Sequence, residues 1–220
     1  MSDNVQLASV LYSFPASGMT AAIPQLRDPR AAATRMAGFA LVIFPVAVLA
    51  WATMIAPAQP VAEAGLCLYG TRAQTILPFA VGMVALSWCF LRIGWLLRSE
   101  EPVLSRLMSL GGLLMIGIVL TPFTLSGLVN LVHIAIASAL FVAQLGAVAL
   151  LLDRPSGASG WLPLVALGAG DLLAACAMVV DSPTMWLGQV LSQLGFLSLL
   201  RGHLLGAGRV ELVQGAEVMG

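Results

Sequence analysis

Six long apolar stretches limit what this sequence can fold into. A helix of about 20 apolar residues crosses the hydrocarbon core of a bilayer, and each stretch has about this length. The stretches lack the alternation of a lipid-embedded barrel strand, and helices satisfy their own backbone hydrogen bonds in lipid. Short polar segments such as "RSEEP" and "DSP" separate them. The expected spans are residues 36–57, 76–98, 104–122, 130–152, 160–181 and 184–205.

The composition agrees with a membrane protein and argues against a soluble one. Charged residues make up 9% of the chain and hydrophobic residues 60%, whereas soluble domains carry about a quarter charged residues. The net charge is zero, so no basic field would attract nucleic acid. We therefore predict an all-α, polytopic six-transmembrane-helix bundle over 36–205, with tails at 1–35 and 206–220. Its main partner is the lipid bilayer, and a membrane-protein partner or a homo-oligomer stays open.

The arginines predict the orientation of the bundle. With the N-terminus inside, nine of the ten arginines fall on the cytoplasmic side and Arg72 falls outside. This asymmetry follows the positive-inside rule and predicts both termini inside a bacterial plasma (inner) membrane. The first ten residues lack the features of a cleaved signal, so we expect the N-terminus to be retained. The nine are Arg27, Arg30, Arg35, Arg92, Arg98, Arg106, Arg154, Arg201 and Arg209.

One carboxylate, Asp171 in "LGAGDLLAA", stands in the middle of the span 160–181. An ionisable group at this depth costs between about 2.5 and more than 10 kcal/mol, so it should face the bundle interior. We expect it within reach of Gln193, near the middle of the last span, or of Arg92 in the second. Gln189 lies one turn from Gln193 on the same helix face. Asp171 is then either a cation-binding or proton-binding group on a transport path or a hydrogen-bond anchor between helices.

Small residues beside this carboxylate predict a closely packed helix pair. Ala166, Gly170 and Ala174 repeat at four-residue spacing, a pattern that lets a neighbouring backbone approach closely. The short "DSP" turn should make the last two spans antiparallel neighbours. Such a seam is the common explanation for these glycines, so it is compatible with both interpretations of Asp171.

The fourth span carries a second set of polar side chains. Asn130, His133 and Gln144 lie on one helix face, and Gln144 has a depth similar to that of Asp171. His133 is either a ligand near the outer end or an interfacial histidine bonded to Asn130 or Thr124. His203 lies at the opposite end, which excludes a haem held by two histidines.

Known catalytic signatures do not occur in the sequence. HExxH, GxSxG and phosphate-binding glycine loops are all missing, and the cysteines have no metal-binding spacing. We therefore expect no catalytic residue, metal or cofactor, and an enzyme is the least favoured class.

Three motifs resemble a largely uncharacterised family of bacterial six-helix membrane proteins akin to the eukaryotic DRAM-type proteins. They are "GGLLMIGIVLTP" ending at Pro122, "NLVHIAIASALF" containing His133, and "GQVLSQLGFLSLL" in the last span. The resemblance covers about residues 36–205 and implies a six-helix fold without an assigned reaction. The family usually has an acidic residue after the proline, where this chain has Phe123 and Thr124.

Two functional hypotheses follow from these residues. The first is a small carrier or channel for a proton-coupled or amphipathic solute that uses Asp171. The second is a non-catalytic partner or assembly subunit whose polar residues only fix helix packing. A water-accessible cavity at Asp171 would favour the carrier, and a closely packed carboxylate would favour the subunit. The candidate binding residues are Asp171, Gln193, Gln144, Arg92, His133, Asn130 and Gln189.

Overall fold

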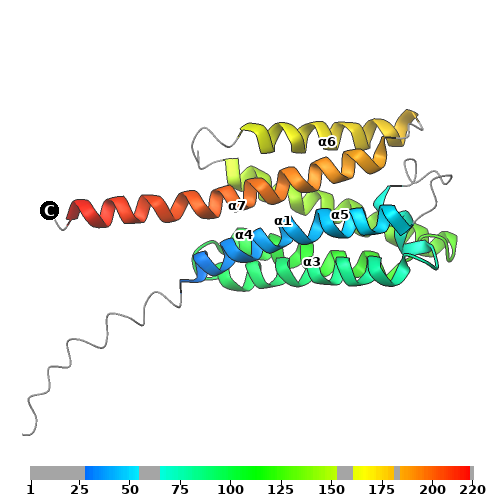
Figure 1. The fold of residues 1–220 in the computed structure, drawn as a ribbon, viewed down its shortest axis with the longest axis horizontal. Helices are drawn as coiled ribbons and strands as arrows, with labels where there is room; N and C mark the ends of the chain where they lie inside the picture. The colour runs from blue at the N-terminus through cyan, green and yellow to red at the C-terminus, as the bar shows by residue number, and fades with distance from the viewer. Residues whose placement is uncertain (1–27, 55–64, 153–160, 181–183, 219–220) are drawn as a thin grey trace, which may run out of the picture.

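The described part of the chain is all-α, as predicted. The computed structural model describes residues 28–54, 65–152, 161–180 and 184–218, and these form seven helices (Figure 1). Six of them occupy the six expected positions, and a short 3₁₀ helix lies in the loop after the first. The helices are α1 (Pro29–Met54), η2 (Leu66–Thr71), α3 (Ile76–Leu97), α4 (Pro102–Leu120), α5 (Gly127–Leu152), α6 (Trp161–Val180) and α7 (Met185–Val218).

Helix α1 begins at Pro29, earlier than the expected start at residue 36. The side chain of Asp28 explains the difference, because its Oδ1 accepts the Arg30 N–H at 2.8 Å. An aspartate at the N-cap followed by proline in the first turn is a standard helix start. Much of the tail predicted over 1–35 lies outside the described residues.

Helix α7 continues to Val218, so the segment predicted as a tail over 206–220 is helical for most of its length. The turn between α3 and α4 is short, and the N–H groups of Glu100 and Glu101 both bond to the Leu97 carbonyl. Pro102 then occupies the first turn of α4, where its missing N–H costs nothing.

Helix α7 contacts three of the other long helices. Helix α7 packs against α6, α1 and α5, while α3 packs between α1 and α4, and α5 follows α4. Helix α6 packs mainly against α7 and lies on the outer side of it (Figure 1). The neighbours α5 and α6 therefore both reach α7, from different sides.

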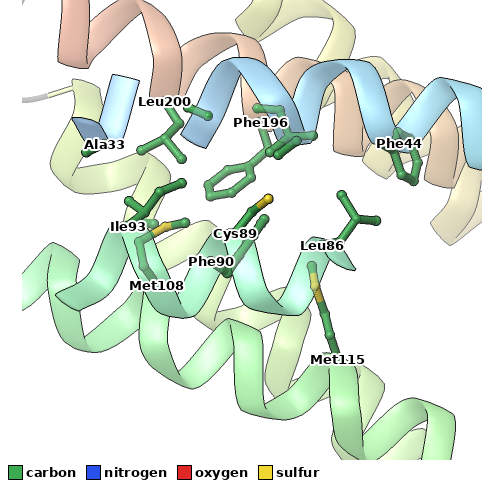
Figure 2. Packing of buried hydrophobic residues seen from close by; sticks show 14 of the residues in the cluster. Ala33, Phe44, Leu86, Cys89, Phe90, Ile93, Met108, Met115, Phe196 and Leu200 are labelled. Carbon is green, nitrogen blue, oxygen red and sulfur yellow. The ribbon is translucent and has the colours of Figure 1, made fainter. Parts of the chain in front are cut away.

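Most of the buried side chains of the core come from α1, α3, α4 and α7 (Figure 2). Alanines on α1, among them Ala33 and Ala37, let its backbone approach the aromatic and aliphatic side chains of its neighbours. Phe90 of α3 and Phe196 of α7 meet at the centre, with ring centroids 5.9 Å apart. This core holds α7 against α1 and α3 and so determines which of its faces remain for α5 and α6.

Among the described residues, four helices are long and apolar enough to cross a membrane: α1 over Pro29–Ala52, α3, α4 and α5. A shorter apolar stretch, Trp161–Ala177, lies in α6, and within the same described ranges α7 is not among the four. Polar residues such as Gln189, Gln193 and Arg201 lower the hydropathy of α7, and contacts with three other helices shield much of its surface from lipid. The chain is a multi-pass membrane protein in contact with the bilayer.

Candidate functional site

Helices α6 and α7 form a seam in which three glycine positions have no room for a larger side chain. A Cβ on Gly188 of α7 would lie 2.5 Å from the Ala174 nitrogen, and one on Gly195 would lie 2.5 Å from the Leu167 nitrogen. On α6, a Cβ on Gly170 would collide with the backbone nitrogen of Ser192. Backbone atoms therefore touch along the seam, which is the packing that small residues allow between membrane helices.

Asp171 is held at this seam by a hydroxyl group. The Ser192 Oγ donates a hydrogen bond of 2.5 Å to Asp171 Oδ1, across the two helices. The expected contact with the last helix is therefore present, but the predicted partner Gln193 was wrong by one residue. Because Gly170 packs directly on Ser192, the next residue on α6 falls beside the Ser192 side chain.

Gln193 faces a different helix. Its Oε1 accepts a 2.8 Å hydrogen bond from Nε2 of Gln144 on α5. Consecutive helical residues point about 100° apart, so Ser192 meets α6 while Gln193 meets α5. The buried Nε2 of Gln193 has no hydrogen-bond partner among the described residues. Asp171, Ser192, Gln193 and Gln144 thus form a polar line across α6, α7 and α5.

Arg92 does not take part in this polar line. Its guanidinium lies over the Trp95 ring of the same helix, 4.2 Å from the centroid. Helix α3 packs between α1 and α4, whereas α6 lies on the outer side of α7 (Figure 1). The prediction that Arg92 could pair with Asp171 was wrong. It relied on the similar depth of the two residues in the membrane, but their helices are not neighbours in the bundle.

His133 stabilises the end of α4. Its Nδ1 lies 2.7 Å from the Thr121 carbonyl and 3.3 Å from Thr121 Oγ1. Because a carbonyl only accepts hydrogen bonds, Nδ1 must carry a proton and satisfy a carbonyl at the helix C-terminus. The expected partners, Asn130 and Thr124, were therefore wrong. Asn130 lies half-buried in the first turn of α5, where its N–H bonds to the Ser126 carbonyl.

Gln189 connects α7 to the loop that contains η2. Its Oε1 accepts the Leu66 N–H at 2.7 Å. The preceding Gly65 has φ +67°, and a Cβ there would lie 2.6 Å from this same oxygen, so only glycine fits. The loop then buries Tyr69 against Trp51, with ring centroids 5.7 Å apart. Burial raises the pKa of the Tyr69 hydroxyl.

An ionic cluster that the sequence did not reveal lies at one end of the bundle. Glu101, just before α4, pairs with Arg30 of α1 and lies 3.2 Å from His203 Nε2 of α7. The Arg30 Nη1 also lies 3.7 Å from Glu100 Oε2. These four residues join three helices that are far apart in sequence. The charged segment "RSEEP" was visible as a break between spans, but nothing in it predicts the partners of its two glutamates.

The polar side chains described above form hydrogen bonds and ion pairs between helices. Over the described ranges, no group of three or more histidine, cysteine or acidic side chains could hold a metal ion. Comparison with family models, curated proteins and solved structures found no match to this chain. The long apolar helices define the class of the protein, a multi-pass membrane protein.

Proposed function

We propose that this protein is a non-catalytic membrane subunit whose polar line fixes the packing of α5, α6 and α7. The observation that carries the proposal is the hydrogen bond from Ser192 to Asp171 at a seam where backbones touch. A carboxylate in this place sets the register of α6 along α7. Interhelical polar contacts of this kind contribute about 1 kcal/mol and specify alignment more than stability.

The outer face of α6 supports a role in assembly. Because α6 packs mainly on α7, it leaves large apolar side chains exposed, among them Leu162, Val165 and Leu172. Such a face meets either lipid tails or the helix of another membrane protein. A subunit holds this face in one orientation through the hydrogen bond of Asp171.

A small carrier or channel is the second candidate, and one observation favours it. The unpartnered Nε2 of Gln193 lies in the same polar line as Asp171, which is itself half-buried. A buried donor without an acceptor is costly and is often satisfied by a water or a solute. In this alternative, Asp171 carries a proton or cation during transport.

Substitutions of Asp171 test its structural role. Asp171→Asn keeps an oxygen that accepts the Ser192 hydroxyl, so the thermal unfolding midpoint in detergent should stay close to that of the wild type. Asp171→Leu removes the acceptor and should destabilise the protein by about 1 kcal/mol. Ser192→Ala should have an effect similar to that of Asp171→Leu. Equal midpoints for the wild type and the leucine variant would contradict an anchoring role.

A measurement of proton flux distinguishes the proposed subunit role from the carrier alternative. The purified wild type and Asp171→Asn are reconstituted in liposomes with a trapped pH-sensitive dye, and a pH gradient is imposed. A subunit should give the same slow leak for both proteins, equal to that of empty liposomes. A wild-type flux that the asparagine variant abolishes would contradict the subunit proposal and favour the carrier.

The proposed topology has six spans with both termini in the cytoplasm, as the distribution of the arginines predicts. It is supported by the ionic cluster, because Arg30, Glu101 and His203 bring the start of α1, the α3–α4 turn and the later part of α7 to one end. A reporter active only outside the cytoplasm should give a signal when fused at residues 65, 127 and 182. Fusions at 101, 156 and 215 should be silent. The reverse pattern would exclude this orientation.

A further inference from the structure

An open apolar groove of about 700 Å³ runs between α1 and α3. Its lining includes the small residues Ala80 and Ala85 of α3, beside which the larger Phe39 and Trp88 are more than half exposed. Both helices are candidate membrane spans, so the groove faces hydrocarbon along most of its length. The short alanine side chains between two exposed aromatic side chains leave a groove that is wide enough for an acyl chain.

One end of this groove carries two arginines. Arg35 comes four residues before Phe39 on α1, and Arg92 comes four residues after Trp88 on α3, so each continues its own exposed stripe by one turn. Met36 follows Arg35, Cys89 precedes Arg92, and both Met36 and Cys89 line the groove. The two arginines therefore lie at the same end of the groove. Both are exposed. Within the described part of the chain, neither guanidinium forms an ion pair with a carboxylate.

The orientation of Arg92 places its charge toward the end of α3. Its guanidinium lies over Trp95, one turn further along, and Arg98 approaches the same ring at 5.1 Å from its centroid. An arginine that extends its charge from an apolar helix toward the interface is typical of membrane proteins. A half-exposed tryptophan between two arginines belongs at the level of lipid headgroups.

We propose that this groove binds an anionic phospholipid, with an acyl chain between α1 and α3 and the phosphate between Arg35 and Arg92. The polarity of the site matches that of such a lipid, since it is apolar along its length and cationic at one end. Guanidinium groups bind phosphate oxygens with paired hydrogen bonds. A transmembrane helix of a partner would fill the apolar part, but it would leave two cations without counter-charge.

Lipid binding by native mass spectrometry tests the proposal. The full chain, purified in detergent, is titrated with phosphatidylglycerol or with phosphatidylcholine of the same acyl chains. Phosphatidylglycerol should bind at least about fivefold more tightly, and Arg35→Gln or Arg92→Gln should each weaken it by about fivefold. The matched control is Arg106→Gln, because Arg106 is also exposed and lies on α4 away from the groove. Equal affinities for the two lipids, or equal losses in all three variants, would overturn the proposal.

A second variant tests the apolar part of the site without changing any charge. Ala85→Trp places an indole in the groove and should weaken phosphatidylglycerol binding as strongly as the loss of an arginine. Phosphatidylglycerol with brominated chains should quench the fluorescence of the wild type more than that of Trp88→Phe. If Ala85→Trp instead breaks a homodimer and leaves lipid binding intact, the groove is an interface between copies and the proposal is wrong.

Discussion

Replacing Glu101 with glutamine should strongly destabilise the protein, by about 3 kcal/mol. The side chain of Glu101 is 10% exposed and that of its partner Arg30 is 12% exposed, so the ion pair is largely shielded from water. Removal of the carboxylate charge leaves the largely buried arginine with only the more distant and more exposed carboxylate of Glu100, and it weakens the contact with His203. The midpoint of thermal unfolding in detergent, followed by tryptophan fluorescence, measures the loss.

Glu100→Gln is the matched control for this prediction. The two glutamates are adjacent, but Glu100 is 35% exposed and lies 3.7 Å from Arg30, so its removal should cost about 0.5 kcal/mol or less. The effects of Arg30→Gln and Glu101→Gln should not add in the double variant, because both remove the same interaction. Equal losses for Glu100→Gln and Glu101→Gln, or full additivity, would show that the cluster does not join the helices as described.

Gly170→Ala should separate α6 from α7 and destabilise the protein by about 2 to 3 kcal/mol. The added methyl group would meet the backbone of Ser192 and the carbonyl of Gly188, and backbone atoms cannot rotate away as a side chain can. The whole of α6 must move, which also lengthens the hydrogen bond between Ser192 and Asp171. The loss is measured by thermal unfolding in detergent.

The same helix offers a control two residues away. A Cβ added to Gly168 would meet nothing within 4 Å, so Gly168→Ala should leave the unfolding midpoint unchanged or raise it slightly through helix propensity. The two variants add the same methyl group to α6 and differ only in the direction it faces. Similar midpoints for both would contradict the close approach of α6 and α7.

Local features of the sequence were enough to locate the helices. Runs of apolar residues and the breaks between them predicted α3 over 76–98, and the helix spans Ile76–Leu97. A capping signal for α1 was also present in "DPR", but hydropathy alone places the start of the span at residue 36. The last span was expected over 184–205, and the helix at this position, α7, extends from Met185 to Val218.

Long apolar helices could be predicted from the sequence, because the need to satisfy backbone groups in lipid acts on each segment separately. Counting residues along each span also predicted that Asp171, Gln144 and the middle of the last helix lie at a common depth. Which side chains meet at that depth follows from the three-dimensional packing. Whether two side chains touch depends on the order of the helices around the bundle and on the rotation of each helix about its own axis. Rotating α7 by about 100° would place Gln193 where Ser192 now faces α6. The close glycine contacts between α6 and α7 determine this rotation, and they cannot be read from either helix alone.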